Sequence, residues 1–188
     1  MSMIGIDEVG RGAWAGPLLV VAARLKAHSN LPDGLTDSKI LSHKQKDQFY
    51  EQLLYVCDFG EGWLSVNEID DFGLGAALKI GAARAVASLG DIEGEEIIID
   101  GSVDLLGDDY PLSRAVVKAD LYEPIVSAAS VYAKVVRDRL MVKLHYTSPE
   151  YGFKDHVGYG TQSHVAALKQ YGITEHHRKS FKPIMDLL

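Results

Sequence analysis

The stretch that most constrains the fold is residues 4–12, where an apolar run leads into two adjacent carboxylates and a Gly-Arg-Gly tripeptide. Its β-branched residues favour an extended strand. Asp7 and Glu8 repel each other, so their proximity has to be offset by a cation, and magnesium, which prefers oxygen ligands, is the natural candidate. Glycines on both sides of Arg11 let a partner approach the backbone, and the guanidinium suits a phosphate. The stretch predicts a strand leading into an anionic site. An Asp-Glu pair on a solvated turn would show the same sequence pattern.

Strand-like and helix-like patterns alternate along the rest of the chain, which predicts an α/β fold. We expect strands near residues 4–8, 18–25, 62–66, 96–100 and 115–118. The first two form a hairpin, and the isoleucine-rich fourth is buried and parallel. We expect helices over residues 42–55, 67–89 with an interruption at 73–75, 124–144 and 161–172. Their starts are marked by a Ser42–Gln45 capping box, by Asn67, by Pro124 in the first turn and by Thr161.

The 188 residues fit one domain, residues 1–188, whose C-terminal part from roughly residue 145 to 188 is helical. No run is apolar or long enough to span a membrane. The single cysteine, Cys57, can form no internal disulfide, so we expect a buried or indifferent thiol and a cytoplasmic protein. A monomer is the default expectation.

The formal net charge of −7 argues against a protein that coats nucleic acid, but it leaves room for an enzyme with a local basic surface. Residues 176–182, which contain two histidines, an arginine and two lysines, could form that surface or could be a solvated tail.

Carboxylates stand at or just beyond three predicted strands: Asp7 with Glu8, then Asp100, then Asp120. Ligand sites of open α/β sheets collect at the carboxyl ends of strands, although Asp100 by itself could merely cap a turn. Carboxylates without histidine or cysteine partners fit magnesium or manganese better than zinc. Two such ions could activate a water and stabilise the leaving oxygen of a phosphodiester. A nucleotide-binding P-loop, a dinucleotide fingerprint and a Gly-x-Ser-x-Gly elbow are all absent from the sequence.

Several motifs occur in the order typical of ribonuclease HII, a family of the ribonuclease H-like superfamily, which the chain resembles from end to end. The matching stretches are residues 6–12, 37–39 with Leu41 and Ser42, 99–101, 117–120, 127–138, 158–164 and 175–181. The resemblance implies a ribonuclease H-like mixed sheet flanked by helices, with the carboxylates over its centre. It also implies cleavage of RNA in RNA–DNA hybrids and nicking 5′ of single ribonucleotides embedded in duplex DNA, with 3′-hydroxyl and 5′-phosphate products.

The resemblance further assigns roles to particular residues. The catalytic carboxylates, which would also hold two Mg²⁺ or Mn²⁺ ions, are Asp7, Glu8, Asp100 and Asp120. The ribose 2′-hydroxyl, which distinguishes RNA from DNA, would be read largely through the backbone of Gly10, Arg11 and Gly12. Tyr159 would press its ring on the adjoining deoxyribose and so detect the RNA-to-DNA junction. Phosphate contacts are expected from Lys39, Ser130 and Lys134.

Three features depart from the family pattern or resist this account. Ala119 stands where the family commonly has glycine, and Gly160 stands where proline often follows the tyrosine, which would loosen Tyr159. Asp7 and Glu8 are neighbours on a predicted strand, so their side chains should point to opposite faces. Both can reach metal only if the strand ends or is irregular there, or if the metals lie at its edge.

The related ribonuclease HIII has an extra N-terminal domain and a glutamate in place of Asp120, so the resemblance favours HII. Residues 181–184 are too short to identify a sliding-clamp peptide, so the question of a clamp partner stays open. Two other hypotheses are a non-catalytic nucleic-acid-binding module on the same fold and a DNA nuclease that is indifferent to the 2′-hydroxyl.

Overall fold

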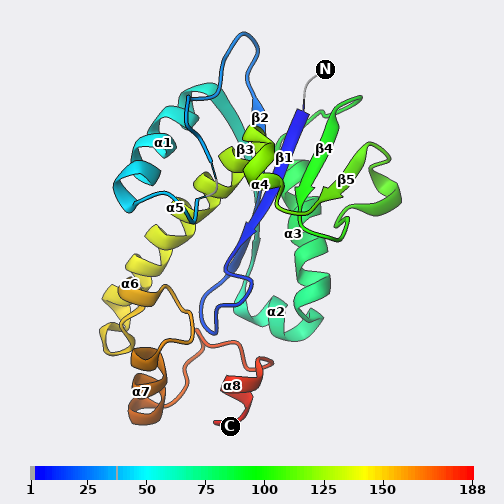
Figure 1. Ribbon diagram of the computed structural model, residues 1–188. Helices are drawn as coiled ribbons and strands as arrows, with labels where there is room; N and C mark the ends of the chain where they lie inside the picture. The colour runs from blue at the N-terminus through cyan, green and yellow to red at the C-terminus, as the bar shows by residue number, and fades with distance from the viewer. Residues whose placement is uncertain (1–2, 37) are drawn as a thin grey trace.

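The computed structural model describes residues 3–36 and 38–188 and contains a mixed sheet flanked by helices (Figure 1). Asp37, part of one family-like motif, lies outside the described residues. The strand order across the sheet is β3-β2-β1-β4-β5. The strands are β1 (Met3–Val9), β2 (Leu18–Leu25), β3 (Cys57–Leu64), β4 (Glu96–Asp100) and β5 (Ser113–Val116). β1 pairs antiparallel with β2 and parallel with β4, which confirms the predicted hairpin and the predicted parallel strand.

Helices cover both faces of the sheet (Figure 1). One face is covered by α2 (Val66–Phe72) and α3 (Leu74–Ser88). The other is covered by α1 (His43–Val56), α4 (Ala119–Tyr122) and α5 (Pro124–Thr147). The shorter elements are η1 (Gly107–Asp109), η2 (Pro149–Tyr151), α6 (Phe153–His156), α7 (Gln162–Tyr171) and α8 (Lys182–Met185). Figure 1 shows α6, α7 and α8 below the sheet, beyond the far end of α5.

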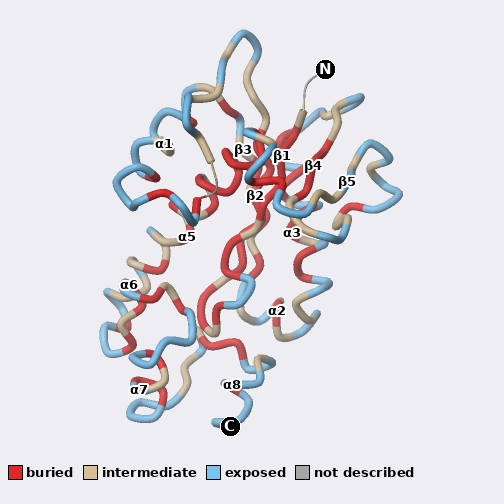
Figure 2. Tube along the Cα trace, viewed as in Figure 1, coloured by how far each residue is buried: buried red, intermediate tan, exposed pale blue. Residues whose placement is uncertain are grey.

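The apolar core is divided by the sheet, because successive side chains of a strand point to opposite faces. Ile4 and Ile6 of β1 pack in the cluster beneath α3, whereas Val9 packs in the cluster beneath α5. Figure 2 shows the central strands of the sheet coloured largely as buried. A third cluster around Phe153 and Met141 joins the end of α5 to the C-terminal segments.

Most helix boundaries follow the predicted local signals. Ser42 and Gln45 form the expected capping box, and Pro124 lies in the first turn of α5. The prediction of Asn67 as an N-cap is wrong, because Ser65 caps α2 in a capping box with Glu68. The error comes from the preceding strand, which follows α1 directly and ends at Leu64.

Two further predictions need correction. The strand expected at 115–118 is β5 (Ser113–Val116), and Lys118 adopts a left-handed conformation with φ 59° that begins α4. Residues 176–182 are not a solvated tail throughout, because His177 and Arg178 are both 0% exposed, while Lys179 and Lys182 lie at the surface. Cys57 is a buried thiol at the start of β3, as expected. In the part of the chain that the structure describes, no helix has the length and apolar character needed to cross a membrane.

Candidate active site

The end of β4 shapes the site. The pairing of β1 with β4 stops at Ile6 and Ile99, and β4 itself ends at Asp100. β1 continues to Val9, paired only with β2. The edge of β1 that carries Asp7 and Glu8 is therefore open beyond the end of β4.

This open edge explains how neighbouring residues of a regular strand serve one site. Asp7 lies on the α5 side, where the Ser130 hydroxyl hydrogen-bonds to its carboxyl group. Glu8 lies on the α3 side and borders a second pocket of about 440 Å³ together with Lys79. Both side chains also line a pocket of about 360 Å³ at the edge itself. Of the arrangements left open by the sequence, the edge of the strand is the one observed.

The edge pocket brings together most of the residues predicted for the site. Its predicted members are Asp7, Glu8, Gly10, Arg11, Lys39, Asp100, Ser130, Lys134 and Tyr159. Val9 and Ser38 complete the lining. Gly12 lies beside it, since a Cβ atom built on Gly12 would be 3.9 Å from Cε1 of Tyr159. Asp120 does not line this pocket.

Asp120 is buried next to the pocket, in contact with Lys39 of its lining. Asp100 Oδ1 accepts a hydrogen bond of 2.8 Å from the backbone N–H of Ala119, which fixes the start of α4 next to β4. Asp120 is 3% exposed, and its Oδ2 lies 3.6 Å from Nζ of Lys39, which does line the pocket. The predicted fourth carboxylate is thus linked to the other three through Lys39 and through its helix.

The electrostatics of the pocket favour a bound cation. Burial raises the pKa of Asp7 to about 8, with a further contribution from the negative charges of Glu8 and Asp100 that outweighs the Ser130 hydrogen bond. Burial also raises the pKa of Glu8, against the opposing charge of Arg11, whose Nη1 lies 3.5 Å from Glu8 Oε1. Burial together with neighbouring negative charge disfavours the ionised forms of Asp7 and Glu8 unless a positive charge joins them.

The donor set suits magnesium or manganese. Within residues 3–36 and 38–188, no three acidic, histidine or cysteine side chains are gathered tightly enough to hold an ion by themselves. Magnesium does not require such a cage, because it usually binds one or two carboxylates and completes its shell with water and substrate phosphate oxygens. The carboxylate oxygens at the open strand edge fit that pattern.

Two buried arginines that sequence reasoning did not select hold the loop after β1. Arg137 donates to the carbonyl oxygens of Pro17 at 2.9 Å, Val157 at 2.9 Å and Ala15 at 3.3 Å. Arg178 donates to Gly16 at 3.0 and 2.9 Å and to Arg11 at 3.1 Å. The signal for Arg137 was its spacing of four from buried Ala133 and buried Met141 on one helix face.

Gly10 owes its identity to Arg137. Its φ is +86°, which other residues rarely adopt, and an added Cβ would lie 2.2 Å from Nε of Arg137. The sequence predicts glycine here because a substrate approaches closely. The structure adds a second reason, since a side chain at this position would collide with Arg137.

Other predicted substrate contacts are held by neighbouring side chains. Ser130 Oγ lies 2.9 Å from Ser38 Oγ, and both hydroxyls are buried at the pocket wall. Lys134 Nζ pairs with Asp138 at 2.8 Å. The serine-rich face of α5 is thus packed toward the site, where the usual expectation for such a face is solvent. Tyr159 is 36% exposed, and its ring centroid lies 5.9 Å from Cζ of Arg137.

Comparison with known proteins agrees with this site. The ribonuclease HII family profile matches residues 4–184. The chain belongs to the ribonuclease HII family. It is 40% identical over 187 residues to Ribonuclease HII of Wolbachia sp. subsp. Brugia malayi (strain TRS), covering 97% of this chain and 88% of that relative. Family membership makes the protein a ribonuclease H-type hydrolase that acts on RNA–DNA hybrids and depends on divalent metal.

Solved structures confirm the ribonuclease H-like fold. The ribonuclease H2 of Pyrococcus horikoshii OT3 superposes with a TM-score of 0.81 at 27% identity, covering 100% of this chain and 97% of that one. A Bst-RNase HIII solved in complex with Mn²⁺ matches with a TM-score of 0.74 at 19% identity, over 100% of this chain and 69% of that one. The second likeness concerns the fold alone.

Proposed function

We propose that this ribonuclease HII nicks duplex DNA 5′ of a single embedded ribonucleotide in addition to cleaving RNA in hybrids. The products carry 3′-hydroxyl and 5′-phosphate ends. The observation that carries the proposal is the edge pocket, which gathers Asp7, Glu8 and Asp100 with Arg11 and Tyr159. It offers both cation ligands and groups suited to a ribose-phosphate backbone in one place.

In this proposal two Mg²⁺ or Mn²⁺ ions are held by Asp7, Glu8, Asp100 and Asp120. Such ions supply an activated water and stabilise the leaving oxygen when bound. Asp7 lies in β1 just beyond the end of its pairing with β4, and Asp100 is the last residue of β4, so adjacent parallel strands present both carboxylates from a rigid support. Because the pKa of Asp7 is raised to about 8, its carboxyl group loses a proton when a cation binds near neutral pH. The Mn²⁺ in the matching ribonuclease HIII agrees with the kind of ion proposed.

The proposed recognition of the ribose depends on the loop 10–12 and on Tyr159. Gly12 lies against the Tyr159 ring, so a sugar stacked on the tyrosine would lie next to the loop backbone. A backbone group can hydrogen-bond to a 2′-hydroxyl, which deoxyribose lacks. Lys39, Ser130 and Lys134 then contact flanking phosphates.

We also propose that residues 1–188 act as one unit and as a monomer. The cytoplasmic location expected from the single cysteine stays a prediction, and the sequence identifies no clamp partner.

The decisive experiment compares three duplexes with and without Mg²⁺: one with a single ribonucleotide, a continuous RNA–DNA hybrid and an all-DNA duplex. We expect Mg²⁺-dependent cleavage of the first two only. Asp100→Asn should lose at least a hundredfold in kcat/KM, because removing one preorganised stabilising group typically has an effect of about 10²–10³-fold. Asp108, which is exposed and lies outside the edge pocket, provides the matched control Asp108→Asn. Near-normal cleavage by Asp100→Asn would refute the assignment, and cleavage of all-DNA duplex would favour the DNA nuclease hypothesis.

Tyr159→Ala tests junction recognition separately. We expect it to reduce nicking at a single ribonucleotide more than cleavage of a continuous hybrid, because only the first substrate requires the junction to be read. Equal losses on the two substrates would contradict the proposed role of the ring.

A further inference from the structure

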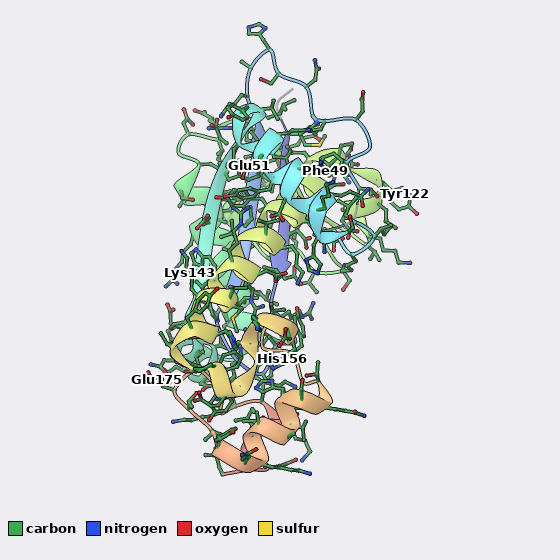
Figure 3. All side chains as sticks on the ribbon, turned by 90° about the vertical axis from the view of Figure 1, so that its left-hand side faces the viewer. Phe49, Glu51, Tyr122, Lys143, His156 and Glu175 are labelled. Atoms are coloured by element: carbon green, nitrogen blue, oxygen red, sulfur yellow. The ribbon has the colours of Figure 1, made fainter. Side chains whose placement is uncertain are left out.

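Three buried histidines lie next to the loop that carries Tyr159, and none of them is used by the proposed chemistry. They are His156 at the end of α6, His164 on α7 and His177 in the segment after α7. The rings of His156 and His164 stack with centroids 4.5 Å apart and planes 13° apart. Nε2 of His164 lies 3.1 Å from Nε2 of His177. Figure 3 shows His156 where the end of α5 meets the C-terminal segments.

The backbone determines the proton positions on two of these rings. The N–H of Gly158 points at Nδ1 of His156 at 3.2 Å, and the N–H of Thr174 points at Nδ1 of His177 at 3.0 Å. A backbone N–H can only donate, so both Nδ1 atoms must accept, and the proton of each neutral ring is on Nε2. For His156 this agrees with the other contact, since its Nε2 lies 2.8 Å from the carbonyl oxygen of Tyr151.

The remaining proton follows from this assignment. Nε2–H of His177 donates to Nε2 of His164, which must therefore accept. The proton of His164 is then on Nδ1, which lies 3.0 Å from the carbonyl oxygen of Tyr159. A single direction of donation, from Thr174 through His177 and His164 to Tyr159, satisfies every contact. We call these four residues the histidine relay.

The relay requires neutral rings, and the interior provides them. Burial lowers the pKa of His164 to about 4 and that of His177 to about 4, so both are neutral at pH 7. A proton added to Nε2 of His164 would face the Nε2–H of His177 and break the contact between them.

The relay connects two parts of the pocket rim. The segment that carries His177 is hydrogen-bonded to the loop after β1, from Arg178 N–H to Trp14 O at 2.8 Å and from Gly16 N–H to His176 O at 2.8 Å. At its other end, the Tyr159 carbonyl accepts from His164 and also from the N–H of Thr161 at 2.9 Å. The interior path thus supports the position of Tyr159 relative to the loop 10–17, in addition to the direct hydrogen bonds from the N–H groups of Trp14 (2.8 Å) and Ala15 (3.2 Å) to the carbonyl oxygen of Gly158.

We propose that His164 is a positioning residue for junction recognition, holding Tyr159 against the loop 10–17 through the histidine relay. The inference rests on the proposed role of Tyr159. It predicts that the relay acts on the discrimination between substrates, while hydrolysis at the carboxylates is left intact.

The first measurement is made on the unmodified protein. Nitrogen-15 NMR distinguishes protonated from unprotonated ring nitrogens of each histidine. At pH 7 we expect Nε2–H on His156 and His177 and the less common Nδ1–H on His164. Nε2–H on His164, or a doubly protonated ring there, overturns the relay whatever the activity of the enzyme.

The second measurement uses the ratio of kcat/KM for the single-ribonucleotide duplex to kcat/KM for the continuous hybrid. His164→Asn keeps an amide N–H near the place of Nδ1–H and should keep the ratio within about twofold. His164→Leu removes the donor and should lower the ratio by about tenfold, the effect of losing one good hydrogen bond. His28→Asn is the control, because His28 is exposed on a loop and its left-handed backbone with φ 61° tolerates asparagine.

The outcomes separate the two proposals. The positioning role is supported if His164→Leu lowers the kcat/KM ratio as Tyr159→Ala does, and His164→Asn leaves the ratio near that of the wild type. If Tyr159→Ala lowers the ratio and a folded His164→Leu does not, the relay positions nothing and the inference fails. If Tyr159→Ala leaves the ratio unchanged, the role of Tyr159 fails and the positioning role fails with it, while the NMR result still reports the proton order independently.

Discussion

We expect Asp7 to destabilise the metal-free protein, by an amount that denaturation experiments can measure. Its pKa is raised from 3.8 to about 8 by burial and by neighbouring Glu8 and Asp100. An acid whose pKa is raised in the folded state takes up a proton on folding between these two values, so stability falls as the pH rises through that window. At pH 7 the loss is about 4 kcal/mol, from about 1.4 kcal/mol per pH unit above 3.8, and at pH 5 it is about 2 kcal/mol.

Asp7→Asn should therefore stabilise the protein while it reduces catalysis. Asparagine does not ionise, and its carbonyl oxygen can still accept from Ser130 and from the N–H of Glu8, which lies 2.8 Å from Asp7 Oδ1. With a chelator present, we expect the free energy of unfolding to rise by about 4 kcal/mol at pH 7 and by about 2 kcal/mol at pH 5.

The assay is urea denaturation followed by circular dichroism at several pH values, in EDTA and in Mg²⁺. Asp108→Asn, at an exposed position, controls for the general effect of removing a negative charge. Mg²⁺ should stabilise the wild type more than the variant and so narrow the difference, because binding to the folded state alone stabilises it. An Asp7→Asn variant whose stability in EDTA is unchanged, or whose gain does not depend on pH, would refute the argument that these acids repel one another in a buried pocket.

Two further predictions concern glycines packed against neighbouring side chains. Gly10→Ala should lower the free energy of unfolding by about 3–4 kcal/mol in urea titrations. Alanine is strained at φ +86° and displaces the buried Arg137 from one of its hydrogen bonds. A loss below about 1 kcal/mol would contradict this reasoning. Gly160→Ala places a Cβ 2.1 Å from Cζ2 of Trp14, so we expect a loss of about 1–3 kcal/mol that largely disappears in a Trp14→Ala background. Strictly additive losses in that double-mutant cycle would show that the two residues do not interact in this way.

The second of these predictions changes the interpretation of a departure from the family pattern. Glycine in place of proline at 160 is expected from the sequence to loosen Tyr159. In the structure the Trp14 indole occupies the space that a side chain at 160 would need. Trp14 and the histidine relay support the loop that carries Tyr159. Glycine at position 160 therefore makes room for the Trp14 indole, which comes from the loop after β1.

Features that depend on neighbouring residues could be predicted from the amino-acid sequence alone. The Ser42–Gln45 box, Pro124 at the start of α5 and the isoleucines of β4 were readable because capping, backbone restriction and alternation act over a few residues. The motifs selected the carboxylates and Tyr159 as the residues to examine.

How those residues come together depends on contacts between distant parts of the chain. Asp7 and Glu8 share a pocket because β4 stops at Asp100 and leaves the edge of β1 open, a fact of strand length in another part of the chain. Arg137 is buried because carbonyl groups of distant loops surround it. The proton order of the histidine relay depends likewise on backbone N–H groups that local patterns do not place. Burial and hydrogen-bond partners are set by where other elements end, and that information is spread over the whole chain.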